Sequence, residues 1–261
     1  MRKKSDPGLL QDKDFVASLQ KGLDVLTCFG RGAVKLTLSE VARRTGSSPA
    51  SARRSLHTLL ALDYLESDGK RFWVAPRALL VAHAYLASRP IPQLAQPLLD
   101  ALSERTRQSA SLGKLLDDDV IIIARSTARR SLSTGLGIGS RLPAYCSALG
   151  RVVLASLPPA DAAQRVRAMR RVPLTPKCIY EAEGVIAAVE RCRAEKWSGN
   201  DEELELGVRS MAVPVHDRTG AFVGGLSISI RAERMSMGEF RDSLLPVLQK
   251  ASVRLGEQIY E

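Results

Sequence analysis

Residues Leu36–Asp68 constrain the fold of this chain more tightly than any other stretch. They read as two short helices around a tight polar turn, followed by a small hairpin. The charged residues between positions 41 and 62 are all basic: Arg43, Arg44, Arg53, Arg54 and, when protonated, His57. A helix pair of this kind is suited to laying its second helix in a groove of DNA. We therefore expect the N-terminal part to bind DNA.

The two helices have recognisable ends. Residues 38–45 predict the first helix, and Gly46 should end it because glycine tolerates a positive φ. Ser47 or Ser48 is expected to cap the second helix, and Pro49 suits its first turn, where a missing N–H costs nothing. This helix should run to about residue 62. Its expected core stripe is Ala52, Leu56, Leu59 and Leu60, and the residues expected to point away from the stripe are Ala50, Ser51, Arg54 and Thr58.

The elements around the helix pair suggest a domain division. Residues 64–74 predict two short strands around Asp68-Gly69, which is a strong hairpin signal and would form a wing. A helix before the pair is expected to begin near Ser18, a plausible N-cap. Residues 76–88 predict an amphipathic helix, and the prolines after it mark a boundary. We expect a DNA-binding domain over 15–76, a linker helix over 77–90 and a second domain over 91–261.

The second domain should be of the α+β class. Helices are expected over 91–106, 148–157, 183–196 and 237–260, and strands over 120–124 and 131–136. Residues 211–216 and 221–230 are expected to pair across the turn Asp217–Gly220. Strands in hairpins with helices grouped between them are typical of an antiparallel sheet covered by helices.

Charge and composition agree with this division. The net charge is +10, and residues 1–90 carry 15 basic against 8 acidic residues, compared with 23 against 20 in the rest. The excess therefore falls where the helix pair lies, which favours a polyanionic partner, although a solvated basic surface would give the same balance. No apolar run approaches the roughly 18–20 residues of a membrane span. Because no secretory signal is apparent either, we expect a cytoplasmic protein without a membrane partner.

Residue types that carry catalysis or bind metals are not grouped. The histidines at 57, 83 and 216 lie far apart, and no nucleophile elbow or Walker loop occurs. Gly135, Gly137 and Gly139 do not form a dinucleotide fingerprint. The four cysteines, at 28, 146, 178 and 192, lack a C-x-x-C pattern, so we expect free thiols. We predict no enzyme activity, cofactor or metal.

Four blocks of this sequence resemble the IclR family of bacterial transcription regulators over essentially the whole chain. They are SLQKGLDVLTCF, LTLSEVARRTGSSPASARRSLHTLLALDYL, RLPAYCSALGRVVLA and DEELELGVRSMAVPVHDRTGAFVGGLSISI. The resemblance implies an N-terminal winged helix-turn-helix, a linker helix and a C-terminal GAF-like effector domain. It also implies dimers or tetramers that bind palindromic operators in double-stranded DNA and respond to small carboxylates. RLPAYCSALGR and HAYLAS look most like regulators of aromatic acid breakdown, the protocatechuate and β-ketoadipate group.

The DNA-contacting residues follow from the helix pair and the wing. The start of the second helix should reach base edges, where arginine can grip guanine in a bidentate way. Serine hydroxyls and helix starts suit phosphates. The predicted contacts are Thr37, Ser39, Ser47, Ser48, Ala50, Ser51, Arg53, Arg54, His57, Lys70 and Arg71. The arginines could instead line a solvated helix face, and His57 could pack at the edge of the domain.

The predicted effector site begins at the loop that enters the helix at Ala148. Amides at a helix start bind anions, so a carboxylate could sit there. The resemblance adds residues beside the acidic run and on two alternating strand positions. The full set is Cys146, Ser147, Ala148, Leu149, Asn200, Asp201, Ser210, Ser227 and Ser229. Arg125, Arg141 and Arg209 could also pair with a carboxylate, although each could equally be a surface or salt-bridge residue.

Several alternatives stay open at this point. Ser227 and Ser229 could lie on the solvent face of an edge strand, and Cys146 could be a buried small residue rather than a ligand contact. The stripe formed by Leu79, Leu80, His83 and Leu86 could pair across a dimer or serve as core within the domain. The effector could be a short 2-oxoacid instead of an aromatic acid. A constitutive architectural DNA-binding protein is a further alternative, although a large, nearly neutral second domain argues against it.

Overall fold

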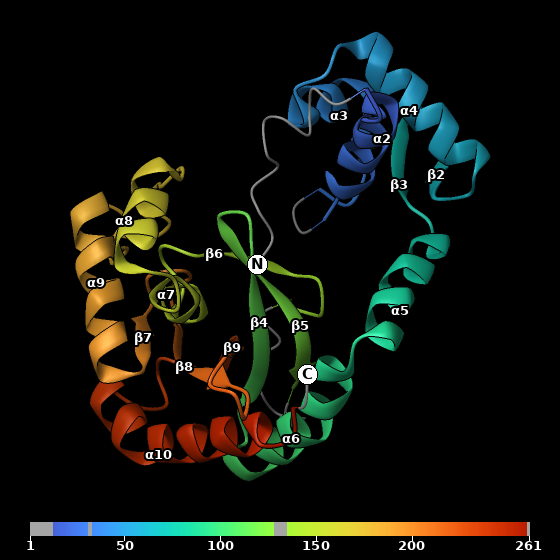
Figure 1. The fold of residues 1–261 in the computed structure, drawn as a ribbon. Helices are drawn as coiled ribbons and strands as arrows, with labels where there is room; N and C mark the ends of the chain where they lie inside the picture. The colour runs from blue at the N-terminus through green and yellow to red at the C-terminus, as the bar shows by residue number, and fades with distance from the viewer. Residues whose placement is uncertain (1–12, 31–32, 128–134, 260–261) are drawn as a thin grey trace. The chain divides into compact units, whose positions relative to one another are not determined.

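The structure is a computed structural model and describes residues 13–30, 33–127 and 135–259. The chain divides into two compact units, Met1–Ser88 and Arg89–Glu261. Each unit has its own apolar core. We describe the two units separately (Figure 1).

Unit 1 is a helix-turn-helix with a small antiparallel sheet. Its helices are α2 (Ala17–Thr27), α3 (Leu38–Thr45) and α4 (Pro49–Ala61). The strands β1 (Leu36–Thr37), β2 (Leu65–Ser67) and β3 (Arg71–Val74) pair in the order β1-β3-β2. The predicted helix pair and wing are thus confirmed, whereas β1 was not anticipated because two residues carry no strand pattern.

The ends of α3 and α4 follow from their caps. Thr37 accepts a hydrogen bond from the Glu40 amide, and the Glu40 carboxylate accepts one from the Thr37 amide, which makes a capping box. Gly46 ends α3 with φ of 65°, as predicted. Ser48 caps α4 by accepting from the Ser51 amide, which decides between the two predicted serines. The tight turn therefore holds the two helices at a defined angle.

Two expectations about unit 1 are wrong. Ser18 does not cap α2, because the N-cap is Val16, two residues earlier, and its side chain accepts no capping hydrogen bond. Ser51 does not point away from the apolar stripe, because only 8% of its surface is exposed and it lies beside Ala52 in the core-facing side of α4. The small Ser51 side chain fits where the helices pack closely, and residue type alone did not reveal this.

The segment after the wing is helical but covers no core. A 3-10 turn, η1 (Pro76–Ala78), leads into α5 (Leu79–Ser88), which buries none of its residues. Leu79, Leu80 and Val81 are 69%, 61% and 59% exposed. The alternative that this stripe forms core within its own domain is therefore wrong.

Unit 2 is built on a six-stranded antiparallel sheet with the order β6-β5-β4-β9-β8-β7. Its strands are β4 (Ser109–Leu116), β5 (Asp119–Ser126), β6 (Arg141–Pro143), β7 (Ser198–Asp201), β8 (Val208–His216) and β9 (Phe222–Arg231). The predicted pairing across residues 217–220 is confirmed as the β8–β9 hairpin. The predicted strand at 131–136 falls largely outside the described residues.

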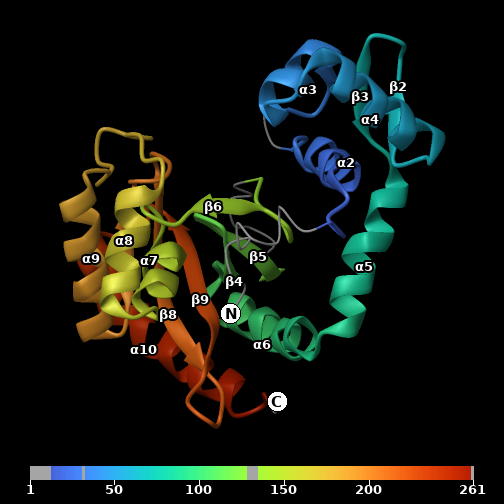
Figure 2. The ribbon, with the colours of Figure 1, turned by 45° about the horizontal axis from the view of Figure 1, so that its top comes forward.

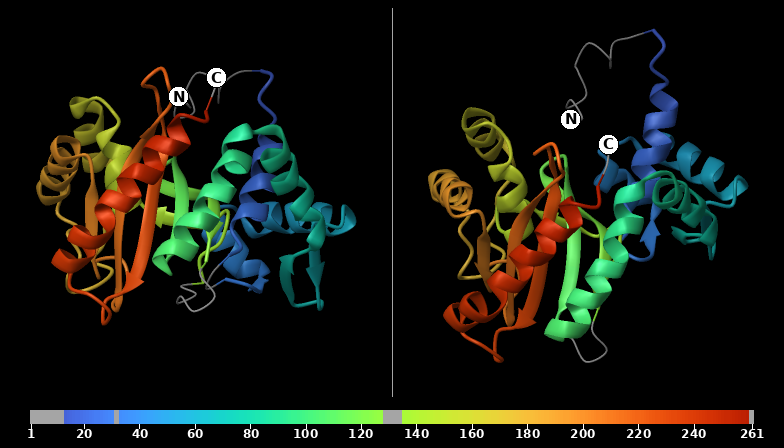
Figure 3. Two further views of the ribbon diagram at one scale, coloured as in Figure 1. Left: turned by 90° about the horizontal axis from the view of Figure 1, so that it is seen from below. Right: turned by 60° about the horizontal axis from the view of Figure 1, so that its bottom comes forward.

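Helices cover both faces of this sheet. On one face lie α6 (Pro90–Thr106) and α10 (Met237–Gly256), which share an apolar core with the strands. The other face carries α7 (Ala148–Ala155), α8 (Pro159–Ala168) and α9 (Ala182–Glu195). Figure 2 shows α7, α8 and α9 gathered on one side of the strands, and Figure 3 shows α6 and α10 in front of them. The predicted α+β class with an antiparallel sheet is confirmed.

The close approach of α7 to its preceding loop depends on Gly150. A Cβ atom there would lie 2.2 Å from the carbonyl oxygen of Ala144. Glycine thus lets the first turn of α7 sit directly on the backbone that leads into it.

Within the described ranges, none of the helices has both the length and the apolar character needed to cross a bilayer.

Candidate nucleic-acid interface and effector cavity

The exposed face of α4 carries cations without carboxylate partners. Arg53 and Arg54 are exposed, and neither forms an ion pair with a described residue. Ala50 and His57 are exposed on the same helix, so the alternative in which His57 packs at the domain edge does not agree with the structure. Exposed arginines on a capped helix can make contacts with phosphates and base edges.

The wing presents two further cations. Asp68 shapes its turn, because one carboxylate oxygen accepts hydrogen bonds from the amides of Lys70 (3.0 Å) and Arg71 (2.8 Å). These amides hold the pKa of Asp68 below its ordinary value. The Lys70 and Arg71 side chains are exposed beyond the turn. The turn therefore positions both cations at the edge of unit 1.

The remaining predicted DNA contacts have local roles in the structure. Thr37 belongs to the α3 capping box, and its hydroxyl also donates to Glu40. Ser47 shares a hydrogen bond with Thr45 at 2.7 Å. Ser39 and Ser48 are exposed, whereas Ser51 is buried and would need a rearrangement to touch DNA.

Unit 2 contains a small, partly open cavity between the sheet and the start of α7. Its volume is about 50 Å³. It is lined by Ser111, Ile122, Arg125, Leu136, Leu142, Ser147, Ala148, Leu149, Asn200, Leu204, Glu205, Val208, Ser210, Ser227 and Ser229. Apolar walls with convergent polar groups are typical of a small-molecule site.

Strand register explains why hydroxyl groups gather on the floor of the cavity. Ser111 pairs with both Arg125 and Ser227, and Ser229 pairs with Ser210. Residues directly opposite each other share one sheet face, and so do alternate residues of one strand. The five side chains therefore form two adjacent rows on the α7 face. Because β9 lies between β4 and β8, the alternative of an edge strand for Ser227 and Ser229 is wrong.

The start of α7 forms the opposite wall. Ser147 caps the helix by accepting from the Gly150 amide at 3.1 Å, and its own hydroxyl donates to the Pro143 carbonyl. Ala148 and Leu149, the first two residues of the helix, line the cavity. Amides at such a terminus carry partial positive charge, which favours an anion.

Arg125 supplies a full positive charge on the sheet side. One of its guanidinium nitrogens, Nη1, donates to the Ser111 hydroxyl at 2.6 Å. Burial lowers the pKa of Arg125 from its ordinary value, although an arginine stays protonated. From the sequence, Arg125 was only one of three arginines that could pair with a carboxylate, and Ser111 was not predicted, because the two residues meet through strand pairing.

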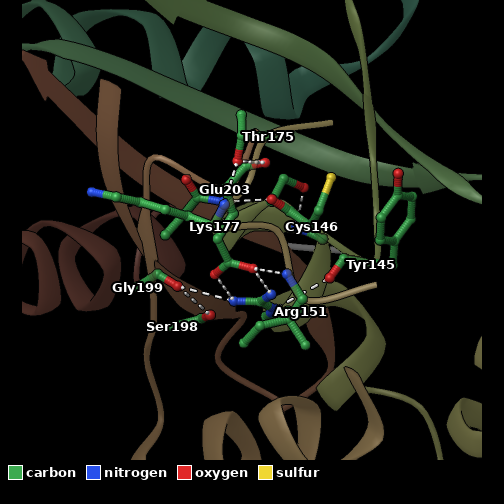
Figure 4. A network of polar contacts seen from close by, with 12 residues as sticks. Tyr145, Cys146, Arg151, Thr175, Lys177, Ser198, Gly199 and Glu203 are labelled. Atoms are coloured by element: carbon green, nitrogen blue, oxygen red, sulfur yellow. Dashed lines mark hydrogen bonds and ion pairs between the residues drawn. The ribbon is translucent and has the colours of Figure 1, made fainter. Parts of the chain in front are cut away.

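A buried ion pair fixes α7 to the rest of the cavity wall (Figure 4). Arg151 and Glu203 form a bidentate pair, with nitrogen–oxygen distances of 2.6 and 2.5 Å. Arg151 also donates to the carbonyls of Tyr145 and Gly199, and Glu203 accepts from the Ile179 amide at 3.0 Å. The pair thus joins α7, β7 and the loop before α9.

Asn200 continues this wall from β7. It is 2% exposed, and its side-chain amide donates to the Cys146 carbonyl. Cys146 itself lies in an apolar cluster with Cys178 and does not line the cavity, and burial raises the pKa of its thiol to about 12. The alternative of Cys146 as a buried small residue fits the structure, and a contact between Cys146 and the effector stays a prediction.

Asp201 is the other predicted residue that does not line the cavity. It points to the opposite face of β7 from Asn200 and pairs with Arg209. Strand alternation explains the difference, since adjacent residues face opposite sides. The other predicted effector residues all line the cavity: Ser147, Ala148, Leu149, Asn200, Ser210, Ser227 and Ser229.

Among the described residues, no cluster of side chains has the composition of a metal site.

Comparison with known proteins covers both units. The IclR helix-turn-helix domain model matches residues 18–69, and the model of the C-terminal domain of bacterial transcriptional regulator IclR matches residues 83–256. The Pca regulon regulatory protein of Pseudomonas putida is 36% identical over 250 residues, which cover 95% of this chain and 86% of that protein.

Solved structures show the same arrangement of elements. A transcriptional regulator from Rhodococcus sp. RHA1 superposes with a TM-score of 0.76 at 36% identity, over 93% of this chain and 97% of that one. A doubly mutated inducer-binding domain of PobR from Acinetobacter, solved with 3-hydroxybenzoic acid, gives a TM-score of 0.61 at 27% identity, over 64% of this chain and 98% of that domain. Together with the two matching family models, these likenesses show that the chain belongs to the IclR family of bacterial transcriptional regulators.

Proposed function

We propose that this regulator binds a palindromic operator through α4 and the wing and that a small acid in the unit 2 cavity changes the strength of this binding. The observation that carries the effector role is the convergence of Arg125, the serine rows and the start of α7 on one small cavity. A constitutive architectural protein would not need such a cavity. We expect no catalysis and a cytoplasmic location, where the chromosome of a bacterium lies.

The cavity chemistry favours an aromatic acid that also carries a hydroxyl or second polar group. Arg125 or the α7 amides would take the carboxylate. The hydroxyls of Ser111, Ser227 and Ser229 would meet the other polar group. The names of the Pca regulator and of the PobR complex with 3-hydroxybenzoic acid support the control of a catabolic operon for aromatic acids.

The size of the cavity predicts movement on binding. An engineered cavity that takes up benzene measures about 150 Å³, whereas this one is about 50 Å³. An aromatic acid would therefore select a wider form of the cavity, and this difference in affinity between two forms would drive the response. The same small volume favours a second candidate, a short 2-oxoacid, which would fit with less rearrangement.

Isothermal titration with a panel of hydroxybenzoic acids, ring-cleavage acids and short 2-oxoacids separates these candidates. We expect one acid to bind saturably to the full chain and Arg125→Gln to weaken it by at least about tenfold, since a charge-assisted hydrogen bond is lost. Arg191→Gln, an exposed arginine on α9, is the matched control. If no acid of the panel binds, or if Arg125→Gln binds as tightly as the control, the proposed effector chemistry is wrong.

We further propose that the chain forms a homodimer through unit 1. Val16, the N-cap of α2, and Leu19 and Leu23 within the helix follow one another at helical spacing. Their side chains are 58%, 62% and 53% exposed. The exposed apolar residues of α5 form another such surface. Apolar surfaces of this kind mark association sites in soluble proteins, and a two-fold dimer matches a palindromic site. Sedimentation equilibrium tests this, and Leu19→Glu/Leu23→Glu should shift the mass towards the monomer.

A further inference from the structure

A second cavity lies on the other face of the sheet, between α6 and α10, and has a volume of about 440 Å³. Its α6 wall is formed by Gln93, Leu94, Pro97, Leu98, Ala101, Leu102 and Arg105. These positions repeat at helical spacing and so form one stripe. The two helices contact each other on one face of the sheet, with α6 over β4 and β5 and α10 over β8 and β9 (Figure 3). The volume is within the range of small-molecule pockets, whereas the cavity at α7 is much smaller.

The space in the middle of this groove exists because the side chains there are small. Pro97 and Ala101 on α6 are exposed, and Ala251 on α10 is half-buried. Leu98 and Val247 pack against the core and form an apolar floor. Two helices bearing larger residues at these positions would close the space. The groove therefore has an apolar floor that is accessible to solvent.

The rim of the groove is basic. Arg105 on α6 and Lys250 and Arg254 on α10 line it and are exposed, and none of the described residues that line it is acidic. None of the three forms an ion pair with a carboxylate in the described parts of the chain. Neighbouring acidic residues on α6, Asp100 and Glu104, lie outside the lining. An occupant should therefore combine an apolar body with negative charge, because the body would cover the apolar floor and the charge would pair with the cations of the rim.

We propose that the groove between α6 and α10 is a second ligand site, distinct from the effector cavity, that binds an amphipathic organic acid with an extended apolar body. The apolar body lies on Leu98, Ala101 and Ala251, and the carboxylate meets the cations of the rim. A second copy of this chain is a poorer occupant, because a two-fold contact would bring two sets of unpaired cations together. Such a ligand would stabilise α6, which begins two residues after α5 ends.

Octanoate, a medium-chain carboxylate, is a suitable probe and can be titrated calorimetrically into the full-length protein. Two variants test the site independently. Ala101→Trp fills the groove from an exposed position, and Lys250→Gln/Arg254→Gln removes two cations without removing apolar surface. The matched controls on α9 are Ala187→Trp and Arg191→Gln, both at exposed positions. Circular dichroism establishes that each variant is folded.

We expect saturable binding of one octanoate per chain, weakened by at least about tenfold in both groove variants and unchanged in both controls. Binding should also persist in Arg125→Gln, which separates this site from the proposed effector cavity. Loss of binding in Arg125→Gln with retention in Ala101→Trp would overturn the proposal, since the acid would then occupy the effector cavity. Absence of saturable binding would also overturn it, and a fall in mass of Ala101→Trp in sedimentation would then identify a second copy as the occupant.

Discussion

Removal of the Glu203 carboxylate should destabilise unit 2 strongly. The side chains of Arg151 and Glu203 are only 4% and 8% exposed, so Glu203→Ala leaves a buried guanidinium without its partner. Breaking a buried ion pair in this way costs about 3–5 kcal/mol. The Ile179 amide loses its acceptor as well, which adds about 1 kcal/mol. We therefore expect a loss of about 4–6 kcal/mol in the free energy of unfolding.

Tryptophan fluorescence can report this loss from the correct unit. The chain has two tryptophans, Trp73 in the wing and Trp197 beside β7, so Trp73→Phe leaves a single reporter in unit 2. Urea slopes for domains of this kind are about 1–3 kcal/mol per molar, so the midpoint should fall by roughly 2 M. The assay compares Glu203→Ala with its parent in that background.

A double variant distinguishes a charge effect from a packing effect. Arg151→Met/Glu203→Leu removes both charges and keeps apolar volume, so it should recover much of the stability lost in Glu203→Ala. A loss below about 1 kcal/mol in Glu203→Ala would contradict a buried ion pair, because the pair would then behave like an exposed one. A double variant no more stable than Glu203→Ala would show that the geometry of the network, rather than its charge balance, matters.

Three further predictions concern single sites. Arg54→Ala should weaken operator binding at least about tenfold in a mobility shift without lowering the melting temperature, and unchanged binding would remove Arg54 from the interface. Gly150→Ala should lower the melting temperature of unit 2 by about 5 °C, because its Cβ would clash with backbone, whereas Gly22→Ala in α2, with nothing nearby, should not. Cys146 and Cys192 have pKa values raised to about 12 by burial, so both stay neutral thiols at pH 8 and should react with Ellman's reagent only after unfolding. Fast reaction of either in the native protein would contradict their burial.

The sequence predicted the DNA-binding unit well because its signals are local. Gly46 ends α3 and Ser48 with Pro49 starts α4 through hydrogen bonds within a few residues. The wing follows from the residue types at its turn. Ser51 was misplaced because helix packing, not residue type, decides which side of α4 is buried. Local chemistry thus defines the elements, and tertiary contacts decide which residues they expose.

The effector cavity was only partly predictable because it depends on strand order. Its serines and the start of α7 could be named from the resemblance and from helix-terminus chemistry. Ser111 joins them only because β4 lies between β5 and β9, and no local pattern specifies that order. Arg151 and Glu203 meet across 52 positions of sequence, so their pairing could not be read from spacing. Asn200 and Asp201 could not be told apart from the sequence, because only the register of β7 shows that Asn200 lines the cavity and Asp201 pairs with Arg209.

The most direct test of the account is operator binding measured in the presence of an acid that binds unit 2. The DNA upstream of this gene and of its divergent neighbour is titrated with the full-length protein in a mobility shift, with and without that acid. We expect a specific shift whose affinity changes with the acid in the natural sequence and no longer changes with the acid in Arg125→Gln. A specific shift that no bound acid alters would contradict the coupling between the cavity and DNA binding. Absence of any specific shift at moderate salt would contradict the assignment of α4 and the wing as the DNA interface.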